Sequence, residues 1–364
     1  MVHGRVLVLG YNTRHIACSA RRAGWEVHAT SAFPDDDLLR CCRRFLPLGE
    51  FDARSPSEAA AAAQEYCEGN ALDGVVLGPG FEALPLGADI VLGTHPSRAA
   101  RAHDKARLAE VLDRLDIPHP ETYPDARHAR YPCMVKPREG GGGHANLVAR
   151  GSGDVPPGGR HMLQELVEGR SASVSILAAP GEAMAVCVNR ILSGDPGMHA
   201  SGPFVYSGNL SPHHPPDEAW MREAAEMLCR KLRLRGSVGV DFLLTPSGPL
   251  VLEVNPRFQG SLDTVELSSG ANIFRAHIAA LEGRLDVFSF SRYAARGVLF
   301  APQDLWVARD LHRRTVADQT PRGAFVARGR PLASPLGAGR TPQMAEVAMR
   351  KAEGWCLRRC HYVV

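Results

Sequence analysis

Two carboxylates and an amide stand close together on two apolar segments of the chain. The run V-L-E-V-N-P-R carries Glu253 and Asn255, and the preceding segment V-G-V-D-F-L-L carries Asp241. If both segments are strands, side chains two residues apart leave the same face, so the three oxygen donors converge. Two carboxylates about 4 Å apart repel by roughly 4 kcal/mol at an effective dielectric of about 20, and a cation between them removes that cost. Because oxygen donors without His or Cys favour Mg²⁺, the pattern predicts a magnesium site that also takes phosphate oxygens.

Exposed acids at a hairpin edge are the alternative interpretation of Asp241 and Glu253. Apolar neighbours on both segments favour burial instead. Arg257 directly follows the second segment. Its guanidinium can bind a phosphate or carboxylate through two hydrogen bonds, or it can form a surface ion pair of little energetic consequence.

A lysine at the end of a predicted strand precedes four glycines. In V-K-P-R-E-G-G-G-G-H, Lys136 is followed by Gly140, Gly141, Gly142 and Gly143. The backbone amides of such a loop approach an anion without side chains intervening, which favours a phosphate cradle, although a glycine run also suits a hinge. Only four of the 42 Lys and Arg residues are Lys, so a lysine indicates a need for a compact ammonium.

A further segment, L-Q-E-L-V-E-G, is typical of a strand that ends in an exposed peptide and a turn. Such a segment can pair its backbone with the edge of an adenine ring, while Leu166 and Val167 flank the base. This pattern means little by itself.

In chain order, the segments H-D-K around Lys105, V-K-P, the glycine run, Q-E-L-V-E-G, V-D-F and E-V-N-P-R resemble the ATP-grasp superfamily. The resemblance covers roughly residues 96–284. Within that superfamily the chain is similar to the carboxylate-amine ligases, a branch of predicted carboligases that includes tyramine-glutamate ligase. The segments L-G-Y-N-T-R, S-A-S and Y-S-G-N-L-S-P carry this finer likeness.

The resemblance implies a role for each matched residue. Lys105 and Lys136 would contact the phosphates of ATP, with Lys136 also near the adenine pocket, and the four glycines would close over the phosphates as a lid loop. Arg257 would stabilise the transferred phosphoryl group or the acyl phosphate. Two Mg²⁺ ions, with Mn²⁺ as an alternative metal, would be bound by Asp241, Glu253 and Asn255. Gln164, Glu165 and Val167 would hold the adenine, largely by main chain, and Ser171 lies at the position of the ribose contact.

Three implied contacts depart from the family pattern or stay open. Where many relatives place an acid on the ribose hydroxyls, this chain has Ser171, which leaves Glu168 or Ser173 for that role. His144 ends the glycine loop, where it can donate to phosphate or face solvent. Arg190 can hold the substrate carboxylate beside a loop at residues 206–212, although an ordinary connection explains that segment equally well.

The function implied is an ADP-forming ligase for a small carboxylate and an amine. The carboxylate would attack the γ-phosphate of ATP, and an amine would displace phosphate from the acyl phosphate under a lid that excludes water. The alternatives are a biotin-carboxylase-like or purine-pathway carboxylation enzyme and a non-catalytic ATP-binding protein of the same fold. A dehydrogenase is disfavoured, because Gly10 is followed by Tyr-Asn-Thr-Arg and not by a G-x-G-x-x-G fingerprint.

The elements that must position these residues alternate between strand and helix at the start of the chain. We expect strands at 6–9, 25–30, 75–77 and 90–92 and helices at 13–22 and 57–67, which together form a small parallel sheet with helices on both faces. The predicted fold class is therefore α/β, with an α+β arrangement in the nucleotide part.

The second half of the pattern predicts an antiparallel, lid-like unit and a hairpin. We expect a helix over 96–115 with Lys105 in its middle. The remaining predicted elements are strands at 131–137, 145–149, 161–166, 171–178 and 183–190, a helix at 217–234, paired strands at 237–245 and 249–255, a helix at 262–283, a strand at 297–301 and a helix at 342–356. The predicted domains are a Rossmann-like unit at 1–95, an ATP-grasp domain at 96–290 with a mobile lid at about 118–190, and a C-terminal segment at 291–364 that packs on the ATP-grasp core.

The charge and composition of the chain indicate which classes of binding partner to expect. The chain of 364 residues has a formal net charge of +3 and scattered basic residues, which predicts neither a nucleic-acid nor a membrane partner. No apolar run approaches the roughly 18 residues of a spanning helix. Nine cysteines without C-x-x-C spacing indicate reduced thiols, so we expect a cytoplasmic protein, with a homodimer left open.

Overall fold

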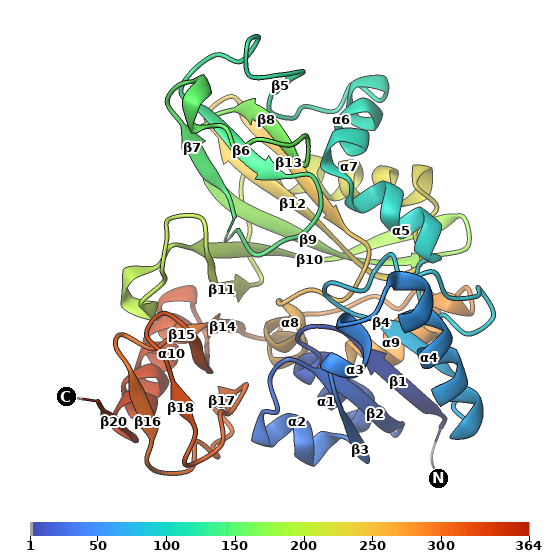
Figure 1. Cartoon of the computed structure of the whole chain (residues 1–364), viewed down its shortest axis with the longest axis vertical. Coiled ribbons are helices and arrows are strands. Elements are labelled where there is room, and N and C mark those ends of the chain that lie inside the picture. The colour runs from blue at the N-terminus through green and yellow to red at the C-terminus, as the bar shows by residue number, and fades with distance from the viewer. Residues whose placement is uncertain (1–2, 144, 364) are drawn as a thin grey trace.

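A computed structural model describes residues 3–143 and 145–363 of the chain. In Figure 1, an N-terminal unit lies at lower right, a C-terminal unit at lower left, and a large sheet rises between them toward a small sheet at the top. The predicted α/β fold class is confirmed. None of the helices in the described residues is long and apolar enough to cross a membrane.

The N-terminal unit is a parallel sheet in the order β3-β2-β1-β4. Its strands are β1 (Arg5–Leu9), β2 (Glu26–Ser31), β3 (Arg44–Pro47) and β4 (Gly74–Leu77), and its helices are α1 (Arg14–Arg22), α2 (Asp36–Cys41), α3 (Gly49–Asp52) and α4 (Pro56–Gly69). Strand order reverses between β1 and β4, so a crevice is expected outside their carboxyl ends. The strand predicted at 90–92 is reduced to a single parallel bridge between Val75 and Val91.

The helix predicted over 96–115 is broken in two. Helix α5 (Pro96–His103) ends at Asp104, and α6 (Lys105–Arg114) begins directly after it. The Asp104 backbone is extended, and its carboxylate accepts the amides of Ala106 and Arg107 as an N-cap. Lys105 therefore stands at the start of a helix and not in the middle of one.

The small upper sheet has the order β5-β8-β6-β7. Its strands are β5 (Thr122–Tyr123), β6 (Cys133–Pro137), β7 (Leu147–Ala149) and β8 (His161–Glu165). The prediction that strands near 171–178 and 183–190 complete this unit is wrong, because β9 (Arg170–Ala179) and β10 (Glu182–Ser193) belong to the large sheet. Two antiparallel strands that are adjacent in sequence can join either sheet. Which sheet they join depends on contacts with residues far away in the chain.

The large sheet runs in the order β13-β12-β9-β10-β11-β14-β19-β15, with β17 paired to β19. Its further strands are β11 (Tyr206–Ser211), β12 (Gly236–Thr245), β13 (Gly248–Asn255), β14 (Tyr293–Gly297), β15 (Leu299–Phe300), β17 (Val316–Ala317) and β19 (Pro331–Gly339). Helix α7 (Glu218–Lys231) packs with α6 on β9, β10, β12 and β13 around a core that includes Phe242, Leu228 and Leu108.

Two further helices connect this sheet to the N-terminal unit. The helix predicted over 262–283 is split into α8 (Leu262–Ser269) and α9 (Ile273–Leu281), because Gly270 adopts φ +75° and Asn272 caps α9. Both helices share a core with α1, in which Phe258 stacks on Phe274. The C-terminal unit packs α10 (Pro342–Leu357) on β14 and β19, beside a sheet of β16 (Leu305–Val307), β18 (Phe325–Val326) and β20 (Cys360–Tyr362).

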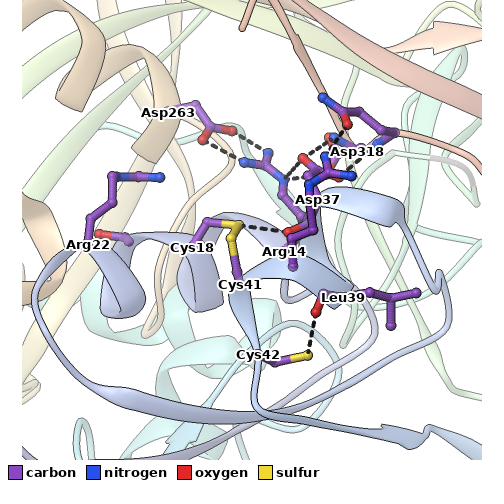
Figure 2. The surroundings of a disulfide bond; sticks show 12 residues. Arg14, Cys18, Arg22, Asp37, Leu39, Cys41, Cys42, Asp263 and Asp318 are labelled. Carbon is purple, nitrogen blue, oxygen red and sulfur yellow. Dashed lines mark hydrogen bonds and ion pairs between the residues drawn. A yellow bond between two sulfur atoms is a disulfide. The ribbon is translucent and has the colours of Figure 1, made fainter. Parts of the chain in front are cut away.

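One disulfide corrects the prediction that all cysteines are reduced. Cys18 on α1 is bonded to Cys41 at the end of α2, while the other seven cysteines are free. Figure 2 shows this bond beside a buried group of charges centred on Arg14. The Arg14 guanidinium donates to both carboxylate oxygens of Asp263 on α8 and to Asp318, which follows β17. This group ties the N-terminal unit to α8 and to the C-terminal unit.

Candidate active site

The three predicted oxygen donors lie together at one end of the β12–β13 hairpin. Asp241 pairs directly with Glu253, and Asn255 lies two residues further along β13 on the same face. The Asn255 side-chain nitrogen donates to Asp241 at 3.1 Å and to Glu253 at 3.3 Å. The convergence expected from the period-two pattern is therefore present, while binding of Mg²⁺ stays a prediction.

The pKa values of the two carboxylates are shifted in opposite directions. Burial and repulsion from Glu253 raise the pKa of Asp241 well above its usual value. Burial also acts to raise the pKa of Glu253, but Lys105, hydrogen bonds from Asp241 and Asn255, and Lys136 outweigh it and lower that pKa to about 2. Burial and mutual repulsion thus disfavour negative charge on both carboxylates at once, which is the condition that a divalent metal relieves.

Two of the four lysines reach this pair from different elements. The Lys105 ammonium lies 3.3 Å from Glu253 and donates to the Gly140 carbonyl at 2.6 Å. Lys136, on β6, donates to the Gln164 side chain at 3.0 Å. Burial and the neighbouring Lys105 lower the pKa of Lys136 to about 8, against the opposing effect of Glu253. The structure thus gathers both predicted phosphate ligands beside the carboxylates.

The tetraglycine loop, Gly140 to Gly143, lies over these groups. Gly140, Gly142 and Gly143 have φ values of +100°, +78° and +74°, a region that other residues rarely adopt. The Gly142 carbonyl accepts the Tyr206 amide at 3.2 Å, and a Cβ on Gly141 would lie 3.7 Å from the Arg257 guanidinium. His144, the predicted additional donor, lies outside the described residues.

Arg257 connects the oxygen donors to the N-terminal unit. Its guanidinium donates to Asn255 at 3.1 Å, to the Phe258 carbonyl at 3.0 Å and to Glu82 at 2.6 Å. Glu82 is 5% exposed, and its second oxygen accepts the Gly80 amide at 2.9 Å. Glu82 was not predicted from the sequence, although it follows β4 at the switch point of the sheet, where ligand sites are expected.

The predicted adenine and ribose residues line the junction of the two sheets. Gln164, which is buried, ends β8 together with Glu165, whose amide donates to the Glu121 carbonyl at 2.8 Å. Val167 lies in the connection to β9, and Ser171 lies on β9 opposite Leu243. Of these residues Gln164 contacts Lys136, and the contacts of all four with a nucleotide stay a prediction.

The structure separates Arg190 from this site. Asp241, Ser173 and Asn189 are cross-strand neighbours, so their side chains share one face of the large sheet. Arg190 follows Asn189 and points to the opposite face, where it forms an ion pair with Glu346 of α10. This geometry does not support the prediction that Arg190 holds the substrate carboxylate.

The segment at 206–212, predicted as a loop, is mainly the strand β11. Its polar side chains are buried because they bond to α8: Asn209 donates to Thr264 at 2.5 Å, and Ser211 lies 2.8 Å from the same hydroxyl. Tyr206 donates to Asn209 at 2.8 Å. These hydrogen bonds tie the segment to α8.

The donor set fits Mg²⁺ in its chemistry. Within residues 3–143 and 145–363, no group of three or more His, Cys, Asp or Glu side chains could hold a metal, so a metal here would need the Asn255 oxygen as a ligand. Two carboxylates and one amide oxygen leave room for the water and phosphate oxygens that Mg²⁺ retains.

The sequence is similar to one family model and to several proteins of known sequence. Residues 102–261 match the sequence family described as the ATP-grasp domain. An uncharacterized protein of Methanocaldococcus jannaschii is 23% identical over 91% of this chain and 87% of its own length. The carbamoyl phosphate synthase large chain of Myxococcus xanthus is 22% identical over 82% of this chain, which spans only 31% of that relative.

Solved structures share the fold over nearly the whole chain. Biotin carboxylase from Campylobacter jejuni has a TM-score of 0.76 at 15% identity and covers 98% of this chain, with 91% of its own chain matched. The L-amino acid ligase from Bacillus licheniformis has a TM-score of 0.73 at 16% identity, with 100% of this chain and 99% of its own covered. A biotin carboxylase domain from Hydrogenobacter thermophilus, solved with MgADP and bicarbonate, also reaches 0.73 at 16%, with 100% of this chain and 91% of its own covered. At these identities the likeness shows the fold alone.

Proposed function

We propose that this chain, which contains an ATP-grasp domain at residues 102–261, is an ATP-dependent, ADP-forming ligase that joins a carboxylate to an amine through an acyl phosphate. The cofactors that this domain implies are ATP and Mg²⁺. The finer likeness to tyramine-glutamate ligase, the domain boundaries, the cytoplasmic location and the homodimer stay predictions.

One observation carries the proposal: opposite charges converge beneath the tetraglycine loop. Lys105 joins the Gly140 carbonyl to Glu253, and Arg257 lies on the other side of Asn255 under Gly141. Lys105 and Arg257 thus flank a pair of carboxylates under a glycine loop, an arrangement that a metal-bound polyphosphate would complete. Asp241, Glu253 and Asn255 would hold Mg²⁺, which would supply positive charge against the carboxylates and the phosphates.

The residues of this chain would act on the transferred phosphoryl group mainly by position and charge. Lys105 and Lys136 would bind the phosphate oxygens, and Arg257 would offset the charge that develops as the carboxylate attacks. Glu82 would hold the Arg257 guanidinium in place. The tetraglycine loop would keep water from the acyl phosphate until an amine displaces the phosphate.

A second candidate keeps the same phosphoryl transfer but uses bicarbonate as the acid. The likeness in fold to a biotin carboxylase domain solved with bicarbonate favours this candidate. The chain spans less than a third of its carbamoyl phosphate synthase relative, so that whole protein's activity carries no weight here.

One screen separates these candidates. Purified protein would be incubated with MgATP, panels of small acids and amines, and bicarbonate, and ADP and phosphate would be measured with mass detection of the product. The ligase requires release of ADP only when an organic acid and an amine are both present. Release with bicarbonate alone would favour the second candidate, and formation of AMP and pyrophosphate would exclude both.

A further inference from the structure

Three consecutive residues at the break between α5 and α6 contact the segment that leads into the tetraglycine loop. The Asp104 carboxylate accepts two hydrogen bonds from the Arg138 guanidinium, the shorter of which is 2.7 Å. The Lys105 amide donates to the Arg138 carbonyl at 3.0 Å. His103 accepts the Gly140 amide at Nε2, at 2.8 Å. The Lys105 ammonium holds the Gly140 carbonyl at 2.6 Å.

Both backbone groups of Gly140 are therefore held by side chains on either side of the helix break. A Cβ placed on Gly140 would meet no atom within 4 Å, so packing does not restrain this residue. Its φ of +100° is one that only glycine adopts readily, and glycine is equally free to leave it. The two side-chain hydrogen bonds thus fix the orientation of the loop at its base.

We infer that His103 is a positioning residue: it fixes the Gly140 amide so that the tetraglycine loop and the Lys105 ammonium face the same phosphate. This inference rests on the proposed function. An ammonium has three donors, and Gly140 and Glu253 occupy two of those of Lys105, which leaves one for a phosphate oxygen. Without His103, the single bond from Lys105 would be the only side-chain bond to Gly140, so the loop would be less well fixed at its base when Lys105 binds phosphate.

The surroundings of His103 match this role. It lies within the electrostatic influence of Glu82, Lys105, Arg257 and Glu253, all of which belong to the candidate site. Nε2 accepts a hydrogen from Gly140, so it carries none of its own, and the ring acts on the loop through that lone pair. His103 acts through Gly140 and Lys105 and needs no contact with the reacting atoms.

The test compares three variants. His103→Leu removes the acceptor, His103→Gln places an amide oxygen that can still accept from Gly140, and His312→Leu changes an exposed histidine of the C-terminal unit as a matched control. Hydrogen exchange of the peptide spanning residues 138–143 is measured without nucleotide. The dissociation constant of MgATP, the KM for ATP and kcat are measured on the same proteins.

We expect His103→Leu to accelerate hydrogen exchange in this peptide. The dissociation constant and KM for ATP should each rise about tenfold, as expected for one lost hydrogen bond, while kcat changes less. His103→Gln should restore both readouts to within about threefold, and His312→Leu should match the wild type. Unchanged exchange in His103→Leu, or an equal defect in His103→Gln, would overturn the inference. A wild-type protein that binds no MgATP would overturn the proposed function, while the exchange data would still report on the contact between His103 and Gly140.

Discussion

Asn255 donates its side-chain amide to Asp241, with 3.1 Å between Nδ2 and Oδ2. The same nitrogen reaches Glu253, so it stands between the carboxylates where a cation would lie. Its oxygen meanwhile accepts from Arg257. Binding of Mg²⁺ would therefore require this amide to turn and present its oxygen to the metal, which couples the metal site to Arg257.

Replacing Asn255 tests that coupling. Asn255→Leu removes the donor between two partly buried carboxylates as well as a predicted metal ligand. We expect ADP formation to fall about 100-fold or more, and MgADP to lose its stabilising effect in thermal unfolding. Ser247→Ala, at the exposed turn of the same hairpin, is the control and should behave as the wild type. Wild-type turnover by Asn255→Leu would exclude Asn255 as a ligand.

Glu82 provides the only carboxylate bonded to Arg257 among the described residues. Glu82→Gln keeps the shape but removes the charge, so the partly buried Arg257 loses its counter-ion and is less well held. We expect kcat to fall about tenfold, because an interaction with a buried charge contributes about 1.5–3 kcal/mol. Steady-state kinetics would measure this, with Glu65→Gln on the exposed side of α4 as the control. A kcat equal to that of the wild type would show that Glu82 does not orient Arg257.

Local patterns predicted the parts of the site that lie on single elements. The alternation around Glu253 and Asn255 fixed which side chains share a face, and two apolar runs joined by T-P-S-G-P predicted the partner strand that carries Asp241. The rarity of lysine in this chain drew attention to Lys105 and Lys136. These patterns depend only on residues close in sequence. The structure therefore agrees with them without any information about distant contacts.

Features that depend on distant partners were missed. The break at Asp104 was not predicted, because an aspartate within an amphipathic pattern does not reveal that it caps a second helix. Glu82 and His103 acquire their roles from Arg257 and Gly140, far away in the chain. Arg190 was misplaced because a one-residue step along a strand moves a side chain to the opposite face.

The buried ring of His277 makes stability depend on pH. It accepts the Ser237 amide at 2.8 Å and lies 3.1 Å from the Leu92 carbonyl, and burial lowers its pKa from 6.5 to about 4. The unfolded chain therefore takes up a proton below pH 6.5 that the folded chain refuses until about pH 4. Stability is retained above pH 6.5 and is lost as the pH falls toward 4, by on the order of 3 kcal/mol.

Urea unfolding between pH 7 and pH 5 would measure this loss, and His277→Gln should flatten the dependence because glutamine does not titrate. His15, whose pKa burial lowers to about 3, contributes in the same direction and remains in the variant. The dependence should therefore be reduced and not abolished. An identical slope in the variant would show that His277 is not the group involved.

The disulfide between Cys18 and Cys41 closes a loop over a sequence separation of 23 residues. A loop of that length reduces the entropy of the unfolded chain enough to contribute about 3 kcal/mol to stability. We expect dithiothreitol, or Cys18→Ser, to lower the free energy of unfolding by about that amount. Cys42→Ser changes the adjacent free thiol and is the control. If reduction leaves the unfolding midpoint unchanged, the bond does not stabilise the protein.

Gly143 allows the tetraglycine loop to lie against the segment before β11. A Cβ at this position would stand 1.9 Å from the Phe204 carbonyl oxygen, and φ is +74°. Gly143→Ala should therefore displace the loop from Phe204, which admits water to the acyl phosphate and increases the ADP formed per molecule of amide product. The control is Gly151→Ala, because Gly151 has extended backbone and a Cβ there would meet nothing within 4 Å. Paired measurement of ADP and amide product gives the ratio directly. A ratio unchanged by Gly143→Ala would mean that docking of the loop on Phe204 does not protect the intermediate.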